Sequence, residues 1–198
     1  MKILILALGL VPLWGCAHEA RREPEAVKEA PARAEAKPDS RPVIVAFGDS
    51  LSAGFGVDPG LSYPDFLQKE LDRRGYAWRV VNAGISGDTT SGALERVEGV
   101  LALRPSIVIL EVGANDGLRG IPVSATRANL EEIIVRLRRA GARVVLAGMT
   151  LPPNYGPEYT RSFENVFREL AGKHHLSLIP FLLMDVAGIP EYMQSDGR

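Results

Sequence analysis

The sequence has few of the residues that build disulfide frameworks and zinc sites. It contains one cysteine and three histidines among its 198 residues. A single thiol excludes an internal disulfide, and so few cysteines and histidines exclude a structural zinc cluster. We therefore expect neither a metal nor another cofactor.

The sequence also lacks an excess of charge. Lys and Arg number 23 against 24 Asp and Glu, which leaves a net charge of -1. Domains that bind nucleic acid usually have a basic patch or stripe, and this balance indicates none. No apolar run reaches the roughly 18–20 residues of a membrane-spanning helix. The composition thus favours one globular domain that binds no nucleic acid.

Three loops that mark other enzyme classes are missing. No Gly-Lys-Ser/Thr phosphate loop occurs. Gly54 and Gly56 lack the spacing and the position of a dinucleotide fingerprint. Gly48 and Ser50 are not followed by the second glycine of the α/β-hydrolase nucleophile elbow. These absences exclude the commonest nucleotide-binding and hydrolase motifs.

The first 15 residues have the pattern of a signal peptide, with Lys2 ahead of an apolar stretch. The single cysteine, Cys16, follows Leu-Trp-Gly, a sequence that resembles the lipobox of bacterial lipoproteins. Cleavage after Ala17, at a small-x-small site, is the alternative. We expect Cys16 to carry a lipid anchor on the periplasmic side of the outer membrane. A soluble periplasmic or secreted protein is the other outcome.

Residues 16–41 comprise this cysteine and a segment with the composition of a tether. Val27 is the only large aliphatic residue among residues 17–41. Such a stretch buries too little apolar surface to offset its ordering entropy. Pro24, Pro31 and Pro38 interrupt any long helix. We therefore predict a disordered tether, followed by one folded domain over residues 42–198.

Within this domain, short apolar runs alternate with segments of helical spacing. Strands buried on both faces read as continuous Val, Ile and Leu, as in parallel sheets. The alternation predicts a three-layer α/β domain with right-handed crossovers. The expected strands are residues 43–47, 78–81, 107–112, 144–147 and 176–179. The expected helices are residues 62–75, 89–103, 124–140 and 157–173.

Polar loops follow the ends of these strands. In open α/β sheets, ligands bind beyond the carboxyl ends of the strands. Turns favour the same residue types for backbone reasons, so a structural role for each loop stays open. Their position at one edge of the sheet favours a site. The loops are residues 48–50, 82–90, 113–116, 150–159 and 185–196.

Three of these loops resemble the sequence blocks of the GDSL, or SGNH, hydrolases. They are residues 48–52 (GDSLS), 86–89 (SGDT) and 113–116 (GAND). The resemblance extends from about residue 43 to the end. It is closest to the bacterial acyl-CoA thioesterase I / arylesterase branch, through residues 82–89, 115–120 and 151–156. It implies the flavodoxin-like fold of this family, a three-layer α/β sandwich with a five-stranded parallel sheet.

The resemblance also implies roles for single residues. Ser50 is the implied nucleophile, and its N–H, the N–H of Gly87 and the side-chain amide of Asn115 form the implied oxyanion hole. Asp196 begins a fourth block, Asp-x-x-His, in which the aspartate orients the histidine base. The aspartates that flank these residues are expected to bond loop backbone. They are Asp49, Asp88 and Asp116.

The His of the fourth block would follow Arg198, the last residue printed. We therefore expect a C-terminally incomplete domain, without that His and the final helix, from a longer reading frame. His174 and His175 cannot replace the base, because they precede the last strand and so belong to the amino edge of the sheet.

Leu151, Pro153 and Tyr155 occupy the loop after the fourth strand. On the resemblance, they are expected to shape an acyl pocket, with a rigid connector as the alternative.

The resemblance implies a serine esterase or thioesterase that uses a Ser-His-Asp mechanism and no cofactor. We expect a monomer, although no residue pattern in the sequence indicates the oligomeric state. Its expected substrates are aryl esters with short to medium acyl chains, with lysophospholipid or acyl-CoA as further candidates. Its expected partners are this small molecule and, through the lipid anchor, a membrane. The alternatives are a catalytically incomplete lipoprotein that binds acyl or glycan ligands, and an acyltransferase or deacetylase of the same fold.

Overall fold

The computed structural model describes residues 39–192, which belong to a compact unit that begins at Asp39. Cys16 and Asp196, to which the sequence assigns a lipid anchor and a catalytic role, lie outside the described residues. Within the described range, no helix combines the length and the apolar character that crossing a membrane requires.

A five-stranded parallel sheet forms the centre of this unit, in the order β2-β1-β3-β4-β5. The parallel sheet predicted from the apolar runs is confirmed, and β2 and β5 begin one residue later than expected. The strands are β1 Val43–Gly48, β2 Arg79–Asn82, β3 Ile107–Glu111, β4 Arg143–Ala147 and β5 Ser177–Ile179.

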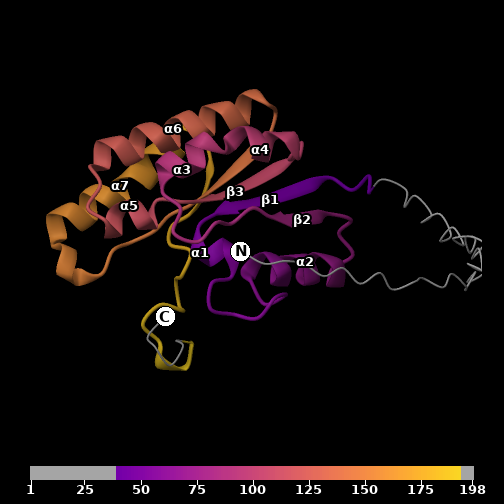
Figure 1. Ribbon diagram of the computed structural model, residues 1–198, viewed down its shortest axis with the longest axis horizontal. Coiled ribbons are helices and arrows are strands. Elements are labelled where there is room, and N and C mark those ends of the chain that lie inside the picture. Colours follow the sequence, from indigo (N-terminus) through magenta and orange to yellow (C-terminus); the bar gives the residue numbers. More distant parts are fainter. Residues whose placement is uncertain (1–38, 193–198) are drawn as a thin grey trace, which may run out of the picture. The chain divides into compact units, whose positions relative to one another are not determined.

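Helices cover the sheet on both faces, which confirms the three-layer architecture. Helices α1 and α2 pack on β1 and β2, whereas α6 and α7 pack on β4 and β5 from the opposite side (Figure 1). The α-helices are α1 Ser50–Ala53, α2 Tyr63–Arg73, α3 Thr90–Glu95, α4 Val97–Ala102, α5 Ala114–Leu118, α6 Val123–Arg139 and α7 Pro157–His174. Two 3₁₀ turns are η1 Pro153–Tyr155 and η2 Pro190–Tyr192.

The core lies between the sheet and helices α6 and α7. Strand β1 is buried along its whole length, because helices cover both of its faces. On α6 and α7, apolar residues recur every three or four positions and form one buried stripe on each helix. They are Leu130, Ile133, Ile134 and Leu137 on α6, and Phe163, Val166, Phe167 and Leu170 on α7. Each such side chain stabilises the fold by about 1.5–3 kcal/mol relative to exposure. This packing holds the strand ends in place.

The opposite face of β3 and β4 is less well covered. Ile107, Ile109 and Val145 alternate with fully buried residues and are only half-buried. Side chains alternate across a strand, so these three point away from the α6 and α7 layer. Among residues 39–192, α1 and α2 are the helices on that side, and they pack on β1 and β2.

The helix predicted over residues 89–103 is interrupted, and this expectation was wrong. Arg96 separates α3 from α4 with φ -103° and ψ 7°, outside helical geometry. Its guanidinium donates hydrogen bonds to the Asp88 carboxylate and to the backbone oxygens of Ala83 and Gly48. These bonds tie together the loops after β1 and β2. The break in the helix is coupled to the tertiary contacts that Arg96 makes.

Candidate active site

Ser50 lies directly beyond the carboxyl end of β1, as the first residue of α1. Asp49 caps this helix, because its carboxylate accepts a hydrogen bond from the N–H of Leu51 at 3.1 Å. Ser50 is half-buried, and neither its N–H nor its hydroxyl has a partner among residues 39–192. Within the described part of the chain, Ser50 therefore offers both a hydroxyl and an N–H donor without a partner.

Gly87 lies in the loop after β2 and adopts a left-handed conformation with φ +80°. Glycine adopts this conformation without the strain of a Cβ. Arg119 donates a hydrogen bond to the Gly87 carbonyl at 2.8 Å, whereas the N–H of Gly87 has no partner within the described range. The loop thus presents a second unpaired backbone donor.

Asn115 lies in α5, directly after β3. Its side-chain amide donates to the backbone oxygen of Asp88 at 2.9 Å and to Oδ2 of Asp49 at 3.2 Å. Asp49 precedes Ser50 and Asp88 follows Gly87, so these two bonds join all three loops. Ser50, Gly87 and Asn115 thus share one edge of the sheet, around the Asn115 amide.

Asp116, the next residue, holds α5 against its neighbours. Its carboxylate accepts hydrogen bonds from the N–H of Thr90 at 2.8 Å and from the Thr90 hydroxyl at 2.5 Å. The Thr126 hydroxyl also donates to it, at 3.3 Å. The expected backbone role of the flanking aspartates is confirmed for Asp49 and Asp116. Asp88 instead accepts from the Arg96 guanidinium at 2.7 Å.

A buried carboxyl group, that of Glu111, lies beneath these loops at the end of β3. Its Oε2 accepts from the Ser52 hydroxyl at 2.7 Å and from the N–H of Asp49 at 3.3 Å. Burial, assisted by the negative charge of Asp49, raises the pKa of Glu111 to about 8. Burial also raises the pKa of Asp49. The sequence analysis did not identify Glu111, although a carboxylate that ends an apolar strand was a usable signal.

The loop after β4 is fixed by its tyrosines. The Tyr155 hydroxyl donates to the carbonyl of Leu118 at 2.9 Å, and the Tyr159 hydroxyl lies 3.2 Å from the carbonyl of Ile121. A hollow of about 610 Å³ lies beside them. It is lined by Tyr155, Gly156, Pro157, Glu158, Tyr159 and Ser162. The loop and the start of α7 are thereby attached to the end of α5 and to the residues that follow it.

The three predicted acyl-pocket residues differ in exposure. Leu151 is buried and packs against Gly117, where its methyl group fills the space that a Cβ would need. Pro153 is exposed and Tyr155 is half-buried. Pro153 and Tyr155 are therefore the members of this set that remain accessible to a ligand.

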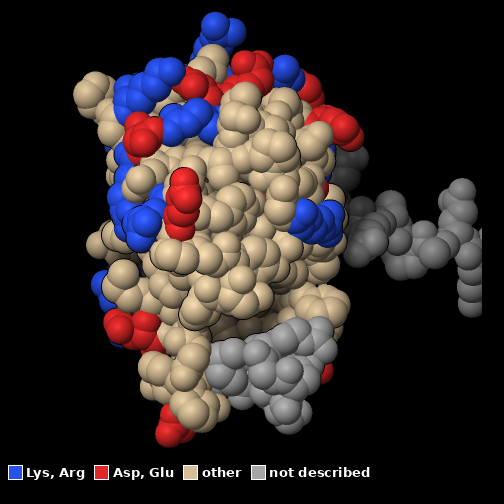
Figure 2. Space-filling view, turned by 90° about the vertical axis from the view of Figure 1, so that its left-hand side faces the viewer, with Lys and Arg blue, Asp and Glu red and all other residues tan. Residues whose placement is uncertain are grey.

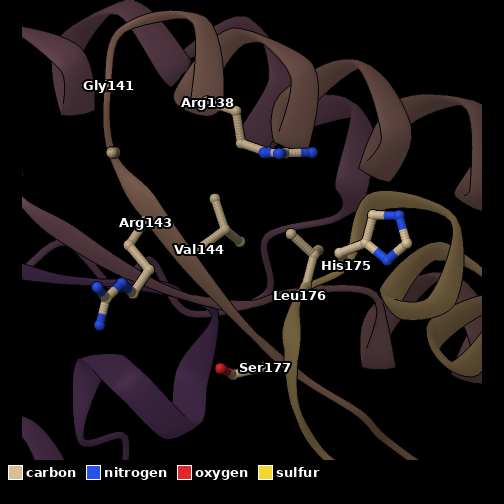
Figure 3. Close-up of a pocket in the computed structure, with 8 residues that line it drawn as sticks. Arg138, Gly141, Arg143, Val144, His175, Leu176 and Ser177 are labelled. Carbon is tan, nitrogen blue, oxygen red and sulfur yellow. The ribbon is translucent and has the colours of Figure 1, made fainter.

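His174 and His175 lie at the opposite edge of the sheet, as predicted. The His174 ring is 2.9 Å from the Glu131 carboxylate, and its side chain is only 13% exposed. Figure 3 shows His175 close to Leu176, where β5 is about to begin, and near Arg138 of α6. A hollow of about 400 Å³ lies here, far along the strands from Ser50. Neither histidine is placed to take a proton from Ser50.

The side on which the strands end carries few charged groups at its centre. Figure 2 shows Lys, Arg, Asp and Glu mainly toward the top and sides of this face, with an acidic side chain nearer its middle and mostly uncharged residues around it. Within residues 39–192, no three His, Cys, Asp or Glu residues are grouped to hold a metal ion. Such a surface suits a neutral, partly apolar ligand better than a polyanion.

A parallel α/β sheet with a serine after its first strand, and donors in the next two loops, is the arrangement expected of a serine hydrolase. Residues 46–198 match the GDSL-like Lipase/Acylhydrolase family, and the chain belongs to this family.

Two curated relatives and a solved structure agree with this membership. Esterase TesA of Pseudomonas aeruginosa is 43% identical over 155 residues, which cover 78% of this chain and 77% of the relative. Thioesterase 1/protease 1/lysophospholipase L1 of Escherichia coli K12 is 36% identical over 155 residues, which cover 78% of this chain and 73% of the relative. The crystal structure of AlinE4, an SGNH-hydrolase family esterase, superposes with a TM-score of 0.76 at 43% identity, over 79% of this chain and 84% of that chain.

Proposed function

We propose that this protein is a serine hydrolase of carboxylic esters and thioesters. The observation that carries the proposal is the juxtaposition around Asn115. The Ser50 hydroxyl and the N–H groups of Ser50 and Gly87, which have no partner among residues 39–192, lie with the Asn115 amide in loops that two hydrogen bonds join. A nucleophile next to several uncharged donors is what acyl transfer requires.

In the proposed reaction, the Ser50 oxygen attacks the carbonyl carbon of the ester. The negative charge that develops on the carbonyl oxygen is stabilised by the N–H groups of Ser50 and Gly87 and by the Asn115 amide. One such donor typically lowers the barrier by about 2.7–4 kcal/mol. Collapse of this intermediate expels the alcohol or thiol, and water then hydrolyses the acyl-serine.

The base that deprotonates Ser50 belongs to the fourth block of the family. By the resemblance, Asp196 orients a His that would follow Arg198. We define the extended chain as residues 1–198 continued downstream in the natural reading frame through that His and the final helix. Sequencing the DNA after Arg198 tests this step directly, and a His codon in the next position is expected.

The substrate class follows from the relatives and from the character of the face around the site. We propose aryl or alkyl esters with short to medium acyl chains, with thioesters as related substrates. The two named relatives are an esterase and a thioesterase/lysophospholipase. The mostly uncharged centre of this face and the hollow beside Tyr155 and Tyr159 are consistent with an acyl chain.

The decisive experiment measures hydrolysis of p-nitrophenyl acetate by the extended chain. Ser50→Ala is expected to abolish turnover, because it removes the nucleophile. Ser106→Ala, an exposed serine just before β3, is the matched control and should retain full activity. Hydrolysis that survives in Ser50→Ala would refute the serine mechanism.

We further propose that the protein is exported and anchored through Cys16. The support is the sequence alone, in which a single thiol follows an apolar leader and precedes the compact unit that begins at Asp39. Two or three acyl chains would make such anchoring stable, whereas one would be marginal.

A further inference from the structure

The mechanism above makes no use of Glu111, although this residue is fully buried directly beneath the site. It lies at the end of β3 opposite Gly48, the last residue of β1. A side chain at position 48 would collide with the Glu111 carboxyl group and the Ser52 hydroxyl. The glycine before the Asp-Ser pair therefore makes room for this carboxyl group.

Among the described residues, only one of the two carboxyl oxygens of Glu111 accepts hydrogen bonds. Oε2 accepts from Ser52 and from the N–H of Asp49, whereas no donor reaches Oε1 among the described residues. A buried anionic oxygen without a donor is strongly unfavourable. The Asp49 carboxyl group is close enough to that of Glu111 for each to shift the pKa of the other, and the Asp49 N–H contacts Oε2 of Glu111 at 3.3 Å. A proton on Glu111 turns the contact between the two carboxyl groups from repulsion into a hydrogen bond.

Asp49 is the better placed of the two to hold the negative charge. Its carboxylate accepts from the N–H of Leu51 and from the Asn115 amide. Hydrogen bonds to a carboxylate favour its ionised form, whereas deeper burial disfavours ionisation of Glu111. The pair thus carries one proton, on Glu111, and one charge, on Asp49.

We propose that Glu111 is a positioning residue for ester hydrolysis, which acts by donating its carboxyl proton to Asp49 beneath the oxyanion hole. The inference rests on the proposed function, in which Asn115 stabilises the oxyanion. With the proton present, Glu111 donates one hydrogen bond to the Asp49 carboxylate. The Asn115 amide, which donates to Asp49 at 3.2 Å, can then also donate to the substrate oxygen. Without the Glu111 proton, the negative charge on Glu111 adds to that on Asp49, and both oppose the negative charge of the oxyanion. The Asn115 amide then stays bonded to Asp49.

Among the described residues, no other charged or titratable group can neutralise the Asp49–Glu111 pair as the proton on Glu111 does. Arg96 is engaged with Asp88 and with two backbone oxygens. The Tyr63 hydroxyl contacts Ser52, and burial raises the pKa of Tyr63, so this phenol stays neutral. Asp88 adds to the repulsion, because its charge raises the pKa of Asp49. The protonation of Glu111 therefore controls the local charge.

The proposal predicts an alkaline limit on activity. Because burial raises the pKa of Glu111 to about 8, the residue is protonated at neutral pH and ionises above it. If the ionised form is inactive, kcat falls about tenfold between pH 7 and pH 9. The fall should appear in kcat with little change in KM, because the oxyanion exists only during the reaction.

The test compares the extended chain with its Glu111→Gln variant in p-nitrophenyl acetate hydrolysis from pH 5.5 to 9.5. A glutamine oxygen can accept the bonds of Oε2, and its amide can donate to Asp49, so the variant imitates the protonated state. We expect kcat at pH 7 to stay within about threefold of wild type, and the alkaline fall to disappear. Glu98→Gln, a control at an exposed residue of α4, should retain the wild-type profile.

A flat wild-type profile up to pH 9.5, or an unchanged alkaline fall in a folded Glu111→Gln variant, overturns the proposal. Should this variant fail to fold, the infrared band of a protonated carboxylic acid in the wild type decides. If the band disappears with rising pH at the same midpoint pH as the fall in kcat, the proposal is supported. If the band is already absent at pH 7, the proposal is refuted. Activity in a parallel Ser50→Ala sample would instead refute the proposed function.

Discussion

Replacing Asn115 with alanine removes the side-chain donor that joins the loops around Ser50. In the proposed transition state, this amide faces the developing oxyanion. Loss of one such donor costs about 2.7–4 kcal/mol, which corresponds to about 10²–10³ in kcat. KM should change little, because the interaction forms only in the transition state.

The same substitution has a structural cost that must be separated from the catalytic one. The variant loses the bond to the Asp88 backbone oxygen, a neutral bond that contributes about 0.5–1.5 kcal/mol to stability. It also loses the bond to the charged Asp49 carboxylate, which contributes about 1.5–3 kcal/mol. We therefore expect a lower melting temperature of the extended chain in addition to the loss of kcat.

Asn129→Ala is the matched control for this prediction. The Asn129 amide donates to the Thr90 hydroxyl at 3.1 Å, in the network that supports Asp116, and it is not one of the proposed oxyanion donors. Its loss should lower the melting temperature and leave kcat within about threefold of wild type. The assay is p-nitrophenyl acetate turnover at pH 7, with thermal melting of the same samples. Nearly unchanged kcat in Asn115→Ala, or an equal loss in Asn129→Ala, would contradict the assignment of Asn115.

Three further predictions concern the anchor, the loop after β4 and the stability of the fold. Cys16→Ser should move the protein from the membrane fraction to the soluble periplasmic fraction, and a wild type that is already soluble would disprove the anchor. Replacing residues 151–155 with Gly and Ser should change the preference for acyl-chain length more than the activity on acetyl esters, whereas equal losses would indicate a rigid connector. The melting temperature should fall from pH 5 to pH 8, because unfolding lowers the pKa of Glu111 from about 8 towards 4.5 and releases its proton. Glu111→Gln should weaken this fall, and an unchanged slope would show that other groups cause it.

The apolar runs of the sequence were sufficient to predict the sheet. Parallel strands are buried on both faces, so β1 and β3 appear as nearly continuous Val, Ile and Leu. The positions of Ser50, Gly87 and Asn115 at the strand ends followed from the same pattern and from the resemblance. Family membership and the three-layer fold were therefore predictable before any coordinates.

Short elements escaped the sequence analysis for a physical reason. Helices α1 and α5 have four and five residues, too few to show a helical period. They begin two and three positions after the last residues of β1 and β3, so the motif residues that appeared to be loops are in part helical. Leu151 was similarly ambiguous, since an apolar residue in a loop can line a pocket or join the core.

Only the tertiary structure determined which groups meet beneath the site. The strand order places β1 between β2 and β3, which brings Glu111 against Asp49, 62 positions earlier in the chain. No local pattern encodes that contact, and neither residue alone has a reason to hold a proton at neutral pH. Arg96 is a parallel case, because its bonds to the loops after β1 and β2 form only once those strands are paired. The strands were set by local hydrophobicity, whereas the charge state beneath Ser50 depends on burial and on neighbours that folding supplies.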